Sequence, residues 1–383
     1  MDTDQTLKIG IICYPSVGGS GIVATSLGTE LAKRGHEVHF ISYERPCRLY
    51  LDMPHTHFHP VMINDYSLFK YPDYILPLSV KIAEVSCSQR LDILHVHYAV
   101  PHATAAILAR SMLPLIKQPR LVTTLHGTDI TLIAKDPGYG PAIRHSLLHS
   151  DAVTTVSEYL KAETDRFLGF ESTIEIIPNF FEPTKPSKSK EDMRRLLYLN
   201  DDEIMILHSS NLREIKRIDL LLETVSRLRP KKLFKLVILA GNSFKPFKKQ
   251  VHQLGLQDRI IVKENVHEID NYLQAADISL FTSETESFCL GILEAMFYAC
   301  PCVAFAVGGI PEIVEDGVSG MLIPSGDVDK LAVAVQFLIQ NPVFRKSLGA
   351  AAKVQAERRL SAKVIVPRYE AIYRLILHRD AQR

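Results

Sequence analysis

The chain alternates short β-rich segments with helical patterns, and after an interruption near its middle the same alternation begins again. In the first half, the segments with the composition of strands are residues 8–13, 37–42, 92–96, 121–125, 152–156 and 175–177. Helical patterns lie between them, for example residues 22–34 and 101–111. Such alternation predicts a parallel sheet with helices on both faces, because parallel strands are joined by crossover helices.

A connector separates the two halves. The segment 178–183, Pro-Asn-Phe-Phe-Glu-Pro, ends the first alternation, and the basic polar stretch 184–190 follows it. Proline, charge and the loss of hydrophobic periodicity are typical of a solvated linker, and its lysines fit that interpretation better than a nucleic-acid patch. We therefore predict an N-terminal domain over residues 1–178 and a C-terminal domain over residues 184–361.

The second half repeats the pattern of the first. Its expected strands are residues 204–208, 235–240, 259–262, 278–281, 301–306 and 321–323, with helices such as 217–229 and 328–340 between them. A length of 383 residues also fits two domains, since single cores rarely grow beyond about 250–300 residues. The prediction is an α/β protein with two Rossmann-like, doubly wound domains facing a central cleft. The last helix, about residues 362–383, is expected to pack back on the first domain.

Composition narrows the classes of partner. The formal net charge of +1 creates no overall field for nucleic acid or membrane, and no apolar run approaches the ~18 residues of a spanning helix. The N-terminus is polar, unlike a secretory signal. The six cysteines are scattered through strand-like and helical segments, as reduced thiols would be. We expect a cytoplasmic protein with no nucleic-acid or membrane partner, and a homo-oligomer stays open.

The segment 286–294, Glu-Ser-Phe-Cys-Leu-Gly-Ile-Leu-Glu, has the chemistry of a nucleotide-sugar site. A helix is expected over residues 289–299, and the free backbone N–H groups at its start suit a phosphate. Glu294, about two turns in, can accept hydrogen bonds from a sugar diol. The alternative is a capped surface helix, in which Glu286 complements the helix dipole and Glu294 is solvated. These nine residues alone do not decide between the two.

Candidate cations follow the first strand of the second half. Arg213 and Lys216 stand between that strand and the next helix, where together they can neutralise a leaving diphosphate without a metal. The alternative is a pair of surface cations. Cations are mildly unfavourable near a helix start, which favours a ligand.

Polar residues also follow the strands of the first half. His126, Thr124 and Asp129 come at the end of one strand, Tyr98 at the end of another, and Arg144 lies in a later helical segment. We expect them to line the ligand side of the first domain. Histidines alternate at 95 and 97 and at 55, 57 and 59, but no further ligand completes a set at metal spacing, so no metal site is predicted.

A glycine-rich loop, Val-Gly-Gly-Ser-Gly at residues 17–21, precedes the first helix and favours an anion site. Residues 19–24 also fit the G-x-G-x-x-A dinucleotide fingerprint, and Glu44 stands where a ribose-binding acid is expected. An NAD-dependent oxidoreductase is therefore a rival interpretation. It requires a tight turn, whereas residues 14–18 separate the strand from the fingerprint, and it leaves the carboxylates and cations of the second half unexplained.

These motifs together resemble the retaining glycosyltransferases of family four, which have the GT-B fold. The resemblance rests on the Gly-Gly pair at 18–19, Ser-Asn-Leu-Arg at 210–213 with Lys216, the Glu-x7-Glu pair at 286–294, and Gly-Gly-Ile-Pro-Glu at 308–312. Asp316-Gly-Val-Ser-Gly follows, with Asp316 where the family has Asn. Segments 13–21, 95–98 and 124–129 are similar to family members that transfer N-acetylglucosamine from UDP-N-acetylglucosamine to L-malate in bacillithiol biosynthesis. Other acceptors (an inositol phosphate, a sugar or a lipid) and a non-catalytic sugar-nucleotide binding protein remain alternatives.

The resemblance also implies roles for single residues. The catalytic set would be Arg213, Lys216, Glu286 and His126. The donor-binding set would be Gly19, Ser210, Val266, His267, Phe288, Cys289, Leu290 and Glu294. The acceptor-binding set would be Ser20, Tyr98, Thr124 and Arg144. Neither a metal nor a cofactor is implied, because the UDP-sugar is a substrate, and the implied mechanism is front-face displacement with retained anomeric configuration.

Overall fold

The computed structural model describes residues 6–15, 18–49, 53–62, 74–229 and 233–378. The chain divides into two compact units. The first unit consists of Met1–Asn179 with Ala362–Arg383, and the second unit is Phe180–Ser361. In the described part of the chain, none of the helices has the length and apolar character needed to cross a membrane.

The first unit contains a parallel sheet of seven strands in the order β3-β2-β1-β4-β5-β6-β7. Its strands are β1 (Lys8–Ile12), β2 (Glu37–Ser42), β3 (Thr56–Pro60), β4 (Ile93–His97), β5 (Arg120–Leu125), β6 (Ala152–Thr155) and β7 (Ile174–Ile176). The strand β3 was missed by the sequence prediction. It is an edge strand with the sequence Thr-His-Phe-His-Pro, which is half-exposed and lacks the apolar run of the central strands.

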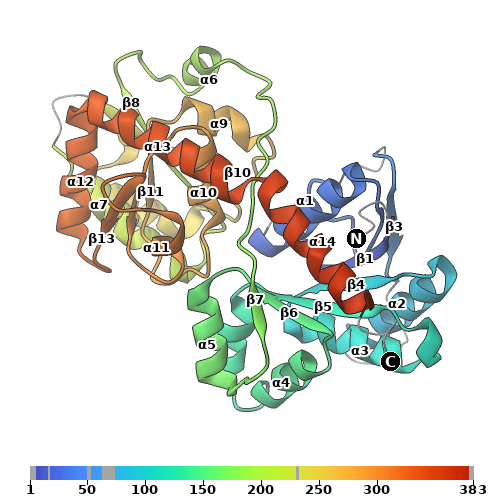
Figure 1. The fold of residues 1–383 in the computed structure, drawn as a ribbon. Helices are drawn as coiled ribbons and strands as arrows, with labels where there is room; N and C mark the ends of the chain where they lie inside the picture. The colour runs from blue at the N-terminus through green and yellow to red at the C-terminus, as the bar shows by residue number, and fades with distance from the viewer. Residues whose placement is uncertain (1–5, 16–17, 50–52, 63–73, 230–232, 379–383) are drawn as a thin grey trace. The chain divides into compact units, whose positions relative to one another are not determined.

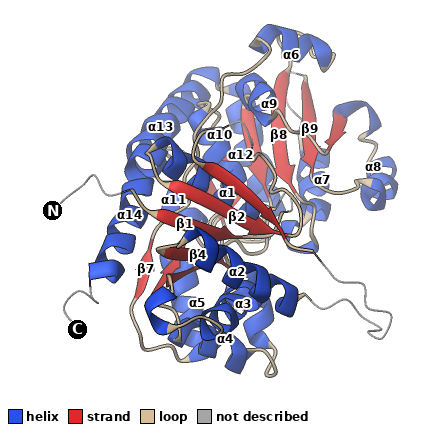
Figure 2. Ribbon diagram, turned by 90° about the vertical axis from the view of Figure 1, so that its right-hand side faces the viewer, coloured by secondary structure: helices blue, strands red, loops and turns tan. Residues whose placement is uncertain are grey.

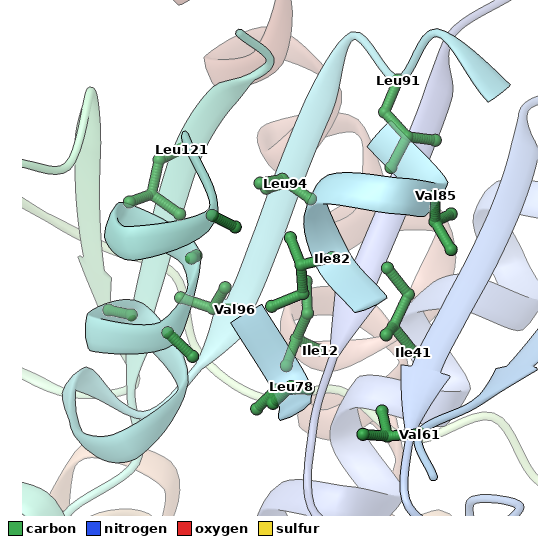
Figure 3. Packing of buried hydrophobic residues seen from close by; sticks show 14 residues of the cluster. Ile12, Ile41, Val61, Leu78, Ile82, Val85, Leu91, Leu94, Val96 and Leu121 are labelled. Atoms are coloured by element: carbon green, nitrogen blue, oxygen red, sulfur yellow. The ribbon is translucent and has the colours of Figure 1, made fainter. Parts of the chain in front are cut away.

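Helices cover both faces of this sheet (Figure 2). They are α1 (Gly19–Lys33), α2 (Ile75–Gln89), α3 (Thr104–Ser111), α4 (Gly140–Leu148), α5 (Glu158–Leu168) and α14 (Ala362–His378), with shorter helical turns at Ala99–Ala103, Leu115–Lys117, Thr128–Leu132 and Ile133–Lys135. The apolar side chains of α2 explain why this helix packs on one face of the sheet. Leu78 and Ile82 point toward Ile12 on β1 and Val96 on β4 in the buried cluster of Figure 3.

The last helix, α14, belongs to the first unit, although the whole second unit, Phe180–Ser361, separates it from the rest of that unit in the chain. It packs against α1 and β5 (Figure 1). Glu370 of α14 accepts hydrogen bonds from Arg34 Nε at 2.8 Å and His36 Nε2 at 3.0 Å. Tyr373 pairs through its hydroxyl with His95 Nδ1 at 2.7 Å. Polar contacts of the buried Glu370 and Tyr373 side chains therefore anchor this helix beside the sheet.

The second unit contains a parallel sheet of six strands in the order β10-β9-β8-β11-β12-β13. The strands are β8 (Ile204–Ser210), β9 (Phe234–Ala240), β10 (Ile260–Glu264), β11 (Ile278–Phe281), β12 (Cys302–Phe305) and β13 (Gly320–Ile323). The helices are α6 (Lys190–Leu196), α7 (Ile218–Arg227), α8 (Lys248–Gln253), α9 (Ile269–Ala275), α10 (Leu290–Phe297), α11 (Ile310–Ile313), α12 (Val328–Gln340) and α13 (Pro342–Leu360), with short turns at Glu214–Lys216, Lys245–Phe247 and Gln257–Arg259.

Both sheets have the strand order of a Rossmann fold. Chain order reverses between β1 and β4 in the first unit and between β8 and β11 in the second. Ligands of such sheets bind beyond the carboxyl ends of the strands at this reversal. The predicted fold class, α/β with two Rossmann-like doubly wound units, is confirmed.

The connector is exposed at residues 184, 185, 187 and 188, as expected of a solvated linker, but it is also tied to the second unit. Thr184 donates its hydroxyl to Asp270 Oδ2 at 2.8 Å, and the backbone N–H of Lys188 donates to Asn271 Oδ1 at 3.1 Å. Both partners are buried residues of α9. Residues 184–188 are thus held by hydrogen bonds to α9, which composition alone did not indicate.

Candidate active site

A buried ion pair lies at the strand reversal of the second unit. Lys216 follows β8, and Glu286 lies in the loop after β11. The Lys216 Nζ is 2.5 Å from Oε1 of Glu286, which also accepts the Ser283 hydroxyl at 2.7 Å. The two charged side chains are only 15% and 9% exposed. The ion pair thus connects the loop after β8 with the loop after β11, the two strands between which the chain order reverses.

The electrostatics of this pair favour a permanent cation. Burial is the largest single influence on the pKa of Lys216 and would lower it, but the charge and hydrogen bond of Glu286, together with the nearby Cys289, outweigh burial and raise the pKa. Lys216 is therefore an ammonium at neutral pH. An ammonium has three donors, and one of them is directed to Glu286. The pair can stabilise anionic ligand groups in a site from which most water is excluded.

Glu294 lies in the interior rather than on a surface helix. The helix α10 begins at Leu290, one residue later than predicted, after Cys289 in a left-handed conformation with φ of 73°. Glu294 is consequently a little more than one turn into the helix, and it is only 7% exposed. Glu286, at 9% exposed, is buried as well. The alternative of a capped surface helix with a solvated Glu294 is wrong.

The Gly-Gly pair before α11 braces the loop that carries Glu286. Gly308 has a φ of +55°, and a Cβ at this position would lie 1.9 Å from the backbone oxygen of Glu286. The N–H of Gly309 donates to that same oxygen at 2.8 Å. Only glycine permits the two backbones to come this close. The Gly-Gly motif thus sets the position of the Glu286 loop.

Replacing Gly308 with Ala is therefore expected to displace the Glu286 loop and lower turnover, with a stability loss of about 1–3 kcal/mol from overpacking. Thermal unfolding and transferase assays measure the two effects. Gly317→Ala is the matched control, because Gly317 has a φ of +72° but no described atom within 4 Å of its Cβ position. Equal losses in both variants would show that backbone strain, and not the contact with Glu286, accounts for the effect.

A hydrogen-bond chain organises the loop after β8. His208 Nδ1 donates to the carbonyl of Leu280 at 2.8 Å, so its Nε2 accepts the Ser210 hydroxyl at 2.8 Å. The Ser210 oxygen then accepts the N–H of Leu212 at 3.2 Å. Burial lowers the pKa of His208 to about 4, which keeps the ring neutral. The predicted donor-binding Ser210 thus orders the loop that leads to Arg213, whose side chain is exposed.

The other predicted donor residues of the second unit lie in two places. Phe288 and Cys289 are buried and Leu290 is half-buried at the start of α10. Val266 packs partly buried against the core after β10, and His267 beside it is exposed. Their roles at phosphate and uracil stay predictions.

In the first unit, the glycine-rich segment forms the start of α1. The predicted helix began at residue 22, whereas α1 begins at Gly19, so Gly19 and Ser20 belong to its first turn. Gly18 precedes it with an extended φ of −85°, so this glycine pair does not serve a left-handed turn. The first N–H groups of a helix have no partner within the helix, and Gly19 is exposed while Ser20 is half-buried.

The residues predicted beyond β4 and β5 are only partly brought together. The rings of Tyr98 and His126 lie 5.5 Å apart, and both residues are half-buried. Contrary to the sequence prediction, Thr124 does not line the ligand side of the first unit. It is fully buried, and its hydroxyl lies 2.6 Å from both His95 Nε2 and Thr154 Oγ1, because its position in β5 directs it into the core. Arg144 lies on the exposed surface of α4.

Asp129 also supports the fold instead of lining the site. It is fully buried, and its carboxylate accepts the backbone N–H groups of Gly127 at 3.0 Å and Ala99 at 3.3 Å. Burial raises its pKa to about 6 despite these bonds. Asp129 therefore joins the loops after β4 and β5.

The sequence indicated no separate role for Tyr14 and His102 near Tyr98, and it pointed to His97 only as one of the alternating histidines. The ring of Tyr14 lies 5.6 Å from Tyr98 and 4.5 Å from His102, and His97 pairs with His126. The only signal was the position of Tyr14 and His97 at the ends of expected strands. Among the described residues, no group of His, Cys, Asp and Glu is arranged to hold a metal ion.

Comparison with known proteins identifies the family. The sequence signature for Glycosyltransferase Family 4 matches residues 17–185, and that for Glycosyl transferases group 1 matches residues 189–355. The chain is 39% identical to N-acetyl-alpha-D-glucosaminyl L-malate synthase of Bacillus anthracis over an alignment of 378 residues. This alignment covers 98% of each protein. This chain is a family-four glycosyltransferase. The fingerprint at residues 19–24 of the glycosyltransferase is therefore not the cofactor site of an oxidoreductase.

More distant proteins agree with this assignment. The glycosyltransferase is 26% identical to D-inositol 3-phosphate glycosyltransferase of Xylanimonas cellulosilytica, over 89% of this chain and 88% of the relative. The sucrose-phosphate synthase of Thermosynechococcus elongatus has a similar structure, with a TM-score of 0.81 over 97% of this chain and 99% of that one at 20% identity. Anabaena HepE, solved with UDP and glucose, gives 0.79 over 95% and 98% at 19% identity. The glycosyltransferase has the GT-B fold.

Proposed function

We propose that this glycosyltransferase moves N-acetylglucosamine from UDP-N-acetylglucosamine to the hydroxyl of L-malate, with retention at the anomeric carbon. This reaction is the first step of bacillithiol biosynthesis. The identity of 39% with the Bacillus anthracis synthase, over 98% of both chains, carries the proposal. The buried Lys216–Glu286 pair supports it, because it provides a fixed cation and a carboxylate at the strand reversal.

The donor is assigned to the second unit. Glu294 accepts the ribose hydroxyls, Glu286 contacts the transferred sugar, and the backbone of residues 288–290 meets the phosphates. As the bond from the anomeric carbon to the β-phosphate oxygen breaks, the ammonium of Lys216 and the guanidinium of Arg213 stabilise the negative charge. The malate hydroxyl attacks from the same face and gives its proton to the leaving phosphate. The reaction then requires neither a metal nor a protein nucleophile.

The acceptor is assigned to the first unit. Malate carries two carboxylates and one hydroxyl, so its site needs N–H donors and a cation. The first turn of α1 offers the amides of Gly19 and Ser20 with the Ser20 hydroxyl, and Tyr98 offers a phenol. Arg144 is the side chain best suited to a bidentate carboxylate contact. Thr124 is reassigned from direct contact to support of this region, because its hydroxyl is occupied inside the core.

Acceptor choice is tested by release of UDP from UDP-N-acetylglucosamine. We expect malate to support rapid release, and lactate, glycerol and inositol phosphates to support little. An inositol phosphate is included because of the relative from Xylanimonas cellulosilytica. Equal rates with lactate and malate, or faster release with an inositol phosphate, would contradict malate as the acceptor and leave the donor assignment intact.

Arg144→Ala is expected to raise the KM for malate by about 10- to 150-fold, which corresponds to one charge-assisted hydrogen bond of about 1.5–3 kcal/mol. The affinity for UDP should stay within about twofold, because UDP is assigned to the second unit. Steady-state kinetics and calorimetry measure the two quantities. Lys117→Ala removes another exposed cation of the first unit and serves as the control. An unchanged KM for malate in Arg144→Ala would show that Arg144 does not bind the acceptor.

A further inference from the structure

A pair of histidine rings joins the carboxyl ends of β4 and β5 in the first unit. His97 is the last residue of β4 and is fully buried, whereas His126 follows β5 and is half-buried. The Nδ1 of His97 lies 2.8 Å from the Nε2 of His126, and the stacked rings are 5.0 Å apart. The Nε2 of His97 is also buried, and no hydrogen-bond partner for it exists among the described residues.

Both rings are neutral in the folded protein. Burial lowers the pKa of His97 well below its ordinary value and lowers that of His126 to about 3, and neighbouring histidines add to both effects. A neutral imidazole has one N–H and one acceptor nitrogen. One of the two rings must therefore donate to the other, and this choice decides which nitrogen of His126 carries its proton.

The buried Nε2 of His97 distinguishes the two arrangements. If His126 donated to His97, the proton of His97 would be on Nε2, as a buried N–H without a partner. Such a group costs about 1–3 kcal/mol, and buried unpaired N–H groups are rarer than incompletely satisfied acceptors. If His97 donates from Nδ1, only a lone pair stays buried at Nε2. The second arrangement is favoured, and it leaves the proton of His126 on Nδ1.

The position of His97 is itself held by its neighbours. Its ring stacks on His95 at 4.6 Å, and its backbone carbonyl accepts the Nδ1–H of His102 at 2.6 Å. The carbonyl can only accept, so the proton of His102 is on Nδ1 and its Nε2 can accept from the Tyr74 hydroxyl at 3.2 Å. Contacts on two sides thus hold His97 where it can direct His126.

We propose that His97 is a positioning residue, which donates its Nδ1 proton to His126 Nε2 and so makes His126 an Nδ1–H donor toward an oxygen of the bound substrate. This inference rests on the proposed function and on the place of His126 in the catalytic set that the family resemblance implies. It goes further by assigning the role of His97, the direction of the hydrogen bond and the tautomer of His126.

The tautomer is measured in the free enzyme by nitrogen NMR of protein labelled at histidine, with His126→Gln used to assign the signals. We expect His126 to be protonated at Nδ1. In His97→Asn the side-chain amide keeps a donor at the position of Nδ1, whereas in His97→Gln the amide moves to the position of Nε2. His97→Asn should retain the tautomer and most of the turnover. His97→Gln should lose the tautomer, with kcat about 10- to 100-fold lower, a loss like that seen when the partner that orients a metal-bound histidine is removed.

A second histidine pair of similar geometry provides the control. His39 on β2 is buried, and its Nδ1 lies 3.0 Å from His59 Nε2. Burial lowers the pKa of His39 to about 4, so it too is neutral. His39→Gln should lower the melting temperature as His97→Gln does and leave kcat unchanged.

A His126 protonated at Nε2 in the wild-type enzyme would overturn the proposal, as would equal kcat values in His97→Gln and His39→Gln. The NMR measurement needs no substrate, so it stands even if His97→Gln does not fold or if the acceptor is not malate. UDP release by the wild-type enzyme tests the acceptor separately.

Discussion

Lys216→Ala should lower kcat by about 10²- to 10³-fold, the cost of removing one preorganised group that stabilises transition-state charge. In the folded enzyme Lys216 is charged and held 2.5 Å from Glu286 in a site with little solvent. Negative charge develops on the leaving UDP, and no flexible surface cation can replace a fixed one without reorganisation. Stopped assays of UDP release at saturating donor and malate measure this loss.

Stability must be separated from turnover in this experiment. Removing Lys216 alone leaves the Glu286 carboxylate buried with Ser283 as its remaining described partner, and breaking a buried pair costs about 3–5 kcal/mol. The double variant Lys216→Met with Glu286→Gln removes both charges at similar volume and should recover stability without recovering turnover. Lys330→Ala, which breaks an exposed pair with Asp327, is the control. Turnover near the wild-type value in a folded variant would contradict the role of Lys216.

Chelation of divalent metal ions should not affect the enzyme. If Lys216 and Arg213 supply the positive charge, activity should be unchanged by EDTA. Loss of activity that Mg²⁺ or Mn²⁺ restores would mean that these two cations are insufficient.

Glu294→Ala should weaken UDP binding by about 1.5–3 kcal/mol for each ribose hydroxyl bond that the carboxylate accepts. Two such bonds correspond to at least about a hundredfold in the dissociation constant. Glu294 is only 7% exposed on α10. The expected loss of affinity applies to UDP and to UDP-N-acetylglucosamine alike, because both ligands carry the ribose. Isothermal titration calorimetry with both ligands measures it.

The controls for Glu294 distinguish binding from folding. Glu294→Gln keeps the shape and one acceptor, so its affinity should lie between those of the wild-type enzyme and the Ala variant. Glu357→Ala on the exposed surface of α13 should change nothing. Unaltered UDP affinity in folded Glu294→Ala would exclude the ribose contact, and unfolding of the variant would indicate a structural carboxylate.

The hydrophobic periodicity predicted twelve of the thirteen strands found in the described residues, at nearly their observed positions, because buried parallel strands are continuous apolar runs. The edge strand β3 was missed since only its neighbour β2 pairs with it, and half-exposed histidines replace the apolar signal there. The start of α1 was placed three residues late because Gly19 and Gly21 are poor helix formers. Their place in the first turn depends on packing and on the backbone of Gly18.

Within the candidate site, sequence by itself determined which residue types are present and at which strand ends they stand. The positions of Lys216 and Glu286 after β8 and β11 were readable, because the carboxyl ends of neighbouring parallel strands meet at one edge of a sheet. Tertiary structure alone decided that the two charges pair, that Glu294 is buried, and that Thr124 is occupied in the core. Spacing along a chain gives the direction of neither a side chain nor a hydrogen bond. Both depend on partners that folding brings from distant parts of the chain, as His97 and His126 show at a sequence separation of 29.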